Sequence, residues 1–108
     1  MARRVEQVRF RVPQSGDAKL HVFFTDSTML TLKSGEIQPQ LKKLARDEKY
    51  GKIKAFLIYE MAYDRAMSSR NGPSLEIQDL LYEIHEAVES LGYKPGILKK
   101  KHKRPAKS

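Results

Sequence analysis

Two carboxylates near the middle of the chain have a spacing that metal-dependent or acid–base chemistry uses. Glu60 and Asp64 lie four residues apart, so on a helix their side chains share one side. Such a pair can hold a divalent cation or share a proton. No third acidic or histidine ligand has a matching spacing, and Arg65 and Arg70 are available as ion-pair partners. We therefore predict a structural role for the pair, with no catalytic residue, no metal site and no cofactor.

Basic residues suit a second kind of chemistry, the binding of phosphate. The C-terminal stretch KKKHKRPAKS places five cations within six residues, a density that can contact several phosphates and release their counterions. A solubilising tail or a nuclear localisation signal has the same composition, and the stretch could also fold over an acidic helix. The tail residues that we predict to bind nucleic acid are Lys99, Lys100, Lys101, Lys103 and Arg104.

The first predicted strand carries another group of cations. Arg9 and Arg11 alternate with apolar residues between Val5 and Val12, which gives a strand one buried face and one basic face. In the next strand, Phe23 projects from the side opposite to its apolar neighbours. Its ring is a candidate for stacking on unpaired bases, although a helix more often covers such a residue. We predict that Arg9 and Arg11 contact nucleic acid.

The elements that would position these residues form an α+β fold. Alternating apolar residues predict strands over about 5–12, 20–24 and 29–32, joined by short turns into a small antiparallel sheet of two or three strands. Two or three helices would pack on this sheet. Pro39 is well placed at the first position of a helix that Gly51 closes. A basic ridge on the outer side of this helix is predicted to contact phosphate through Lys42, Lys43, Arg46 and Lys49.

Two further segments complete the fold. Residues 52–69 fit either a helix or a buried strand, and their composition favours the helix. The apolar spacing of residues 74–91 predicts the helix around which the domain is organised, with Ser74 as its N-cap and Gly92 at its end. Its apolar face consists of Ile77, Leu80, Leu81, Ile84, Val88 and Leu91. An acidic stripe on another side, which we expect to face water or a basic partner, consists of Glu76, Asp79, Glu83 and Glu86.

Composition limits the class of protein. A chain of 108 residues with 40% hydrophobic content can form one compact domain, expected over 1–96, followed by a disordered basic tail over 97–108. The chain has no cysteine, so we expect neither disulfides nor thiolate metal sites. No segment has the roughly 20 apolar residues of a membrane span. We expect no membrane association and a cytoplasmic location, or a nuclear one in a eukaryote.

Charge is unevenly distributed along the chain, whose net charge is +8. Residues 1–54 carry 12 Lys and Arg against 6 Asp and Glu, residues 55–93 carry 2 against 7, and residues 94–108 carry 7 against 0. This pattern favours a small non-enzymatic protein that binds DNA or RNA mainly through electrostatic phosphate contacts. The alternative is a protein-interaction module, an inhibitor or adaptor, that uses the acidic helix 74–91 or a sheet edge. A small nuclease or toxin is a third alternative.

Overall fold

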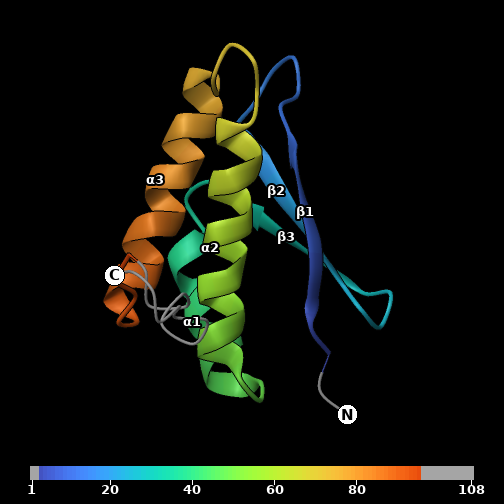
Figure 1. Cartoon of the computed structure of the whole chain (residues 1–108), viewed down its shortest axis with the longest axis vertical. Coiled ribbons are helices and arrows are strands. Elements are labelled where there is room, and N and C mark those ends of the chain that lie inside the picture. Colours follow the sequence, from blue (N-terminus) through green and yellow to red (C-terminus); the bar gives the residue numbers. More distant parts are fainter. Residues whose placement is uncertain (1–2, 96–108) are drawn as a thin grey trace, which may run out of the picture.

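Six elements follow one another in the computed structural model, which describes residues 3–95. The elements are β1 (Val5–Arg11), β2 (Lys19–Phe24), β3 (Met29–Lys33), α1 (Ile37–Asp47), α2 (Gly51–Met67) and α3 (Leu75–Ser90). The strands form one antiparallel sheet in the order β1-β2-β3, and the three helices lie on one side of it (Figure 1). The predicted α+β fold with its small N-terminal antiparallel sheet is confirmed. The tail predicted over 97–108 lies outside the described residues.

The two faces of the sheet differ in composition because side chains alternate along each strand. Val8 pairs with Val22, and Val22 pairs with Leu30, so one face is apolar and packs against the helices. The register slips once, between Val5 and Gln7, where β1 contains an extra residue. The side chains that alternate with these apolar residues point away from the helices.

α1 begins two residues earlier than the sequence predicts. Its first residue is Ile37, which is only 1% exposed and joins the core one turn before Leu41. Burial of this additional apolar side chain accounts for the earlier start. Pro39 therefore occupies the third helical position, still within the first turn, where a backbone N–H has no partner inside the helix. The helix ends at Asp47, before the predicted end at Gly51.

Gly51 begins α2 and brings it into close contact with α1. A Cβ atom at this position would lie 2.1 Å from the carbonyl oxygen of Leu44 and 2.7 Å from Cα of Ala45. The start of α2 therefore passes closer to α1 than any side chain would permit. Tyr50, in a left-handed conformation with φ of 59°, turns the chain between the two helices.

The segment over 52–69 is helical, as its composition favours. α2 lies between β1 and α3 (Figure 1) and contacts both as well as α1. Ala55, Ile58 and Ala62 are fully buried, and the two small alanines allow the neighbouring elements to approach closely. Leu57 and Tyr63 are exposed, so the apolar residues of this helix do not all face the core.

α3 has a defined beginning and end. The hydroxyl of Ser74 accepts a hydrogen bond from the backbone N–H of Ile77 at 3.3 Å, which confirms the predicted N-cap. Gly92 has φ of 103°, and the N–H of Tyr93 donates to the carbonyl of Val88 at 2.9 Å. This arrangement satisfies a carbonyl of the last turn and directs Tyr93 back onto the helices.

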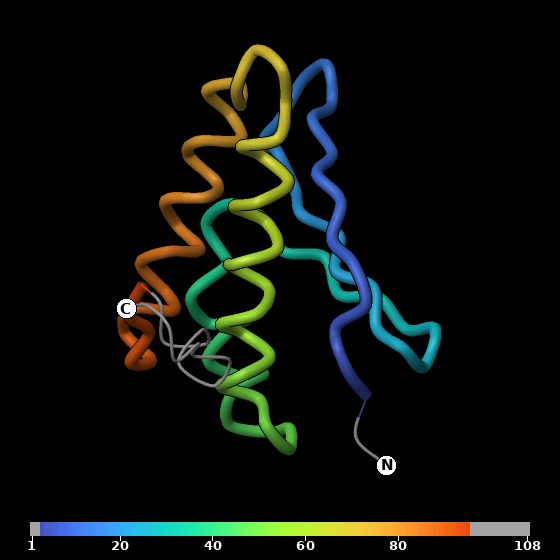
Figure 2. The backbone as a smooth tube through the Cα atoms, viewed as in Figure 1, coloured from blue at the N-terminus to red at the C-terminus, as the bar shows by residue number. Residues whose placement is uncertain are grey.

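One core of buried side chains draws on all six elements. Its largest fully buried members include Phe24, Leu20, Leu32, Ile37, Leu41, Ile58, Leu80 and Ile84. The loops 12–18 and 68–74 lie at one end of the molecule, and the turn 48–50 lies at the other (Figure 2). None of the helices within residues 3–95 is both long and apolar enough to cross a membrane.

Candidate nucleic-acid interface

The sheet has a second face, which the helices leave uncovered. The strand register arranges its outward side chains in three rows that cross β1, β2 and β3. The rows are Gln7, Phe23 and Met29; Arg9, His21 and Thr31; and Arg11, Lys19 and Lys33. We call these nine residues the open face. No helix of residues 3–95 lies on this side of the sheet (Figure 1).

Four cations gather at one end of the open face. Arg11, Lys19 and Lys33 lie directly opposite one another on neighbouring strands, and Arg9 is two residues from Arg11 on the same side of β1. A strand spacing of about 4.8 Å places the outer two backbones of this row about 10 Å apart. None of the four forms an ion pair with a carboxylate of residues 3–95. Like charges directly opposite one another destabilise a sheet, so the row favours an anionic partner.

Two rings lie on the middle strand of the open face. Phe23 is half-buried, and the centroid of its ring is 6.5 Å from that of His21. His21 Nδ1 lies 3.0 Å from the hydroxyl oxygen of Thr31, a hydrogen bond that restrains the imidazole. The helix that more often covers an outward Phe is not found over Phe23 within residues 3–95. Met29, which is 52% exposed, lies directly opposite Phe23 on β3.

The predicted basic ridge lies on the other side of the sheet, in the helix layer. Lys42, Lys43 and Arg46 are exposed on α1, but Asp47 accepts hydrogen bonds from Lys43 Nζ and Arg46 Nε at 3.0 Å each. These bonds, that from Lys43 above all, hold the pKa of Asp47 below its ordinary value. Lys49 lies beyond the end of α1, in the turn to α2. The structure thus separates the ridge from the arginines of β1.

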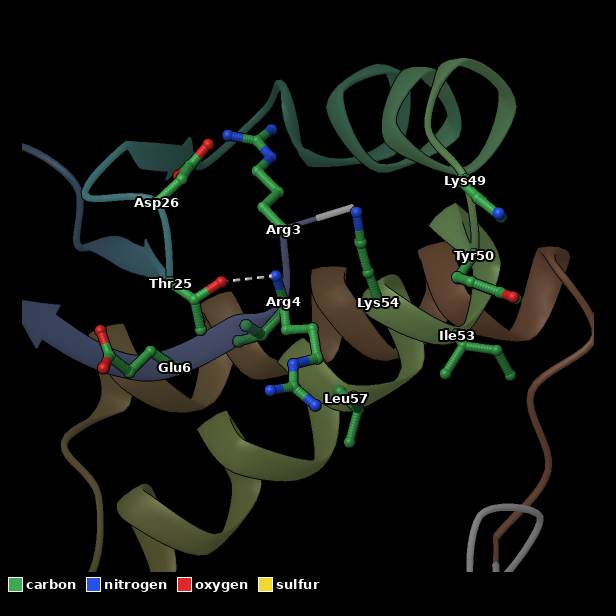
Figure 3. Close-up of a pocket in the computed structure, with 11 residues that line it drawn as sticks. Arg3, Arg4, Glu6, Thr25, Asp26, Lys49, Tyr50, Ile53, Lys54 and Leu57 are labelled. Atoms are coloured by element: carbon green, nitrogen blue, oxygen red, sulfur yellow. Dashed lines mark hydrogen bonds between the residues drawn. The ribbon is translucent and has the colours of Figure 1, made fainter. Parts of the chain in front are cut away.

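A groove between the start of β1 and the start of α2 contains a second set of charged residues (Figure 3). The carboxylate of Glu48 accepts hydrogen bonds from Arg3 and, at 2.9 Å, from Lys54 Nζ, whose side chain is only 6% exposed. The guanidinium of Arg3 also lies 3.8 Å from the centroid of the Phe24 ring. Both hydrogen bonds, chiefly that from Arg3, hold the pKa of Glu48 below its ordinary value. This network joins the segment that precedes β1 to the α1–α2 region.

One member of the carboxylate pair on α2, Glu60, has a structural contact. The hydroxyl of Tyr93 donates a hydrogen bond to Glu60, and Tyr93 packs against the rings of Phe56 and Tyr59 at centroid distances of 5.4 and 5.3 Å. Burial, together with this hydrogen bond, raises the pKa of Tyr93. Asp64 is exposed. Within residues 3–95, no three His, Asp or Glu side chains are grouped so that they could hold a metal ion.

The acidic stripe of α3 is only partly directed toward solvent. Glu83, expected to face water or a basic partner, accepts hydrogen bonds from the hydroxyl of Ser34 at 2.6 Å and the backbone N–H of Gly35 at 2.8 Å. It therefore ties α3 to the β3–α1 loop, whose turn brings these donors within reach. Leu75 and Tyr82, exposed to 73% and 64%, lie among the remaining carboxylates. The other acidic residues of the stripe are exposed, namely Glu76, Asp79 and Glu86.

Sequence reasoning missed two cations of the open face, Lys19 and Lys33. The alternation of each strand contains the signal, because Lys19 lies two residues before His21 and Lys33 lies two residues after Thr31. Arg9 and Arg11 are exposed on the outward side of β1, as their alternation indicates. The predicted tail residues, Lys99, Lys100, Lys101, Lys103 and Arg104, lie outside the described part of the chain.

Three charged surfaces are therefore candidates for contact with a partner: the open face, the basic ridge and the acidic side of α3. No protein-family model, curated protein or solved structure matches this chain. Function is accordingly inferred from the surfaces themselves. Of the three, the open face combines aromatic rings with cations that have no carboxylate partner within residues 3–95.

Proposed function

We propose that this chain is a small non-enzymatic nucleic-acid-binding protein whose phosphate contacts are centred on the open face. The main observation that supports this proposal is the row of Arg11, Lys19 and Lys33. These cations lie directly opposite one another, without a carboxylate of residues 3–95 to relieve their repulsion. A phosphate backbone would relieve it, and each contact would release a condensed counterion.

Affinity would arise mainly from charge, without selection of a base sequence. The net charge of +8 attracts DNA or RNA at long range, and the open face supplies the contacts. The basic ridge adds less, because Asp47 already pairs with two of its cations. Lys99 to Arg104 supply a further cluster of cations for phosphate. Such a protein would act in the cytoplasm, or in the nucleus of a eukaryotic cell.

Salt dependence of binding tests this proposal with two variants of equal charge. The open-face variant carries Arg9→Gln, Arg11→Gln, Lys19→Gln and Lys33→Gln. The matched control changes the ridge, with Lys42→Gln, Lys43→Gln, Arg46→Gln and Lys49→Gln. Each variant loses four positive charges, so any difference between them reports local contact. Fluorescence anisotropy with a labelled oligonucleotide gives the affinity of each protein over a range of salt concentrations.

In the open-face variant, the slope of log K against log salt should become less negative by about 3, because each phosphate contact contributes about 0.7 to 0.9 to its magnitude. In the ridge variant, the slope should become less negative by about 1. Equal losses would show that affinity follows net charge, and the open face would not be the site. No binding by the unmodified protein at low salt would reject nucleic-acid binding altogether.

The acidic side of α3 supports a second candidate function, a protein-interaction module. Leu75 and Tyr82 are large, exposed and surrounded by carboxylates, a surface suited to a basic protein partner. The carboxylate of Glu86, one helical turn along α3, raises the pKa of the Tyr82 hydroxyl. The ratio of absorbance at 260 and 280 nm after purification at low salt separates the two functions. A protein free of nucleic acid that also fails the titration would favour the interaction module.

A further inference from the structure

The open face contains an aromatic and apolar end as well as its cations. Phe23 and Met29 are the apolar members of its nine positions, and they lie side by side on β2 and β3. Arg9 and His21 occupy the next row, and the three-cation row follows. The distance along the strands from Phe23 to Lys19 is about 14 Å, at about 3.4 Å per residue. A ligand that covers this face must therefore offer both a flat apolar group and anionic groups.

A second copy of this chain fits the open face poorly. A stable protein interface buries roughly 800 Å² on each partner, with an apolar centre. Here the apolar part is limited to two neighbouring side chains. A symmetric pair would also bring eight cations into the interface, and none of the nine open-face residues is a carboxylate that could pair with them. The combination of a small apolar area with four cations that have no carboxylate partner within residues 3–95 favours a polyanion that carries rings.

Geometry further distinguishes single strands from duplexes. The bases of a duplex are stacked on one another and present only their edges in the grooves. A ring set in a sheet face, such as Phe23 on the middle strand, cannot stack on them. An unpaired base can be turned outward and laid on that ring while its phosphates reach the neighbouring cations. The hydrogen bond between His21 and Thr31 holds a second ring 6.5 Å away.

We propose that the open face binds single-stranded nucleic acid, with an unpaired base stacked on Phe23, a second beside His21, and the phosphates held by Arg9, Arg11, Lys19 and Lys33. This inference rests on the proposed function and specifies its ligand. The strand would run along β2, from the Phe23 row to the three-cation row. DNA and RNA share the required chemistry, so oligothymidylate and oligouridylate are the two probes. Stronger binding of either probe than of a duplex of equal length supports the proposal.

Replacement of the ring tests the stacking contact in the full-length protein. Phe23→Leu retains an apolar side chain but removes the ring, so affinity for the single-stranded probes should fall about tenfold. Affinity for the duplex should change less than about twofold. Phe23→Tyr should retain the affinity for single strands. The matched control is Met29→Leu, which alters the same row without removing a ring and should leave both affinities within about twofold.

A fluorescent probe covers the case in which Phe23→Leu does not fold. The chain contains no tryptophan, so Phe23→Trp introduces a single indole at the site. Single-stranded probes should quench its fluorescence to saturation, since a stacked base quenches an indole. Tyr82→Trp, on the acidic side of α3, should stay unquenched. An unquenched Trp at position 23 under saturating probe would overturn the stacking contact.

The results separate failure of this inference from failure of the proposed function. If single strands and duplexes bind equally and Phe23→Leu changes neither affinity, the single-strand proposal is wrong. In that case, loss of affinity in the open-face variant would still support phosphate binding. If the unmodified protein binds none of the probes at low salt, both proposals are rejected.

Discussion

Glu48 shows how one carboxylate can hold several elements together. It joins Arg3, which precedes β1, to the nearly buried Lys54 of α2. Glu48→Gln would leave Lys54 without a charge partner in a largely buried position. We expect a loss of about 3 kcal/mol in the free energy of unfolding. Chemical denaturation measures it, and Asp47→Asn, which alters a neighbouring exposed carboxylate, is the control that should change stability little.

The same contact predicts a dependence of stability on pH. The hydrogen bonds to Glu48 hold its pKa in the folded state below the ordinary value of 4.5. Its stabilisation is therefore complete above about pH 4.5 and is lost as pH falls through the lower folded-state pKa. The unfolding free energy of Glu48→Gln should accordingly decrease less steeply below pH 4.5 than that of the unmodified protein. Parallel pH curves for the two proteins would show that this carboxylate is not held by cations.

Glu83 is a second carboxylate that joins distant parts of the chain. Its hydrogen bonds to Ser34 and to the N–H of Gly35 are charge-assisted, and such bonds contribute about 1.5 to 3 kcal/mol. Glu83→Gln should therefore destabilise the protein by about 2 kcal/mol in urea. Glu76→Gln removes an exposed carboxylate of the same helix and should have little effect. Equal unfolding midpoints for the two variants would place Glu83 in solvent, as its sequence pattern alone indicates.

Among the elements, the contact between α1 and α2 depends on one glycine. A methyl group at Gly51 would overlap the carbonyl of Leu44, so Gly51→Ala should destabilise the protein by about 3 kcal/mol. The same change within an unconstrained helix would stabilise it by up to about 1 kcal/mol. Gly72→Ala is the matched control: its φ is 76° and nothing lies within 4 Å of the added Cβ, so it should cost about 1 kcal/mol. Thermal or chemical unfolding shows whether each alanine raises or lowers the stability of the protein.

Most elements of this fold follow from periodicity, and their ends depend on contacts that periodicity does not contain. The alternation in β1 and β2 and the apolar spacing of α3 are each a local property of the sequence. The start of α1 at Ile37 and the position of Gly51 depend on packing against distant residues. Periodicity does not distinguish a helix from a strand over 52–69, because the apolar residues of this segment would lie on more than one side of either element. Its composition favours the helix.

In the molecule as a whole, the open face is a property of strand pairing. Alternation alone indicates Arg9 and Arg11, but the register is needed to place Lys19 and Lys33 directly opposite Arg11. The role of Glu83 likewise depends on a loop almost fifty residues away in the sequence. Lys42, Lys43 and Arg46 are exposed on α1, as the sequence predicts. The separation of this ridge from β1 and its contacts with Asp47 required the structure.

Amide chemical shifts of the ¹⁵N-labelled full-length protein, measured during titration with a short single-stranded oligonucleotide at low salt, show which surface contacts nucleic acid. If nucleic acid binds the open face, the largest changes should fall on β1, β2 and β3, at residues such as Arg9, His21 and Lys33. The amides around Tyr82 on α3 should move little. Changes confined to α1, α3 or residues beyond 95, with the three strands unmoved, would contradict the proposed site.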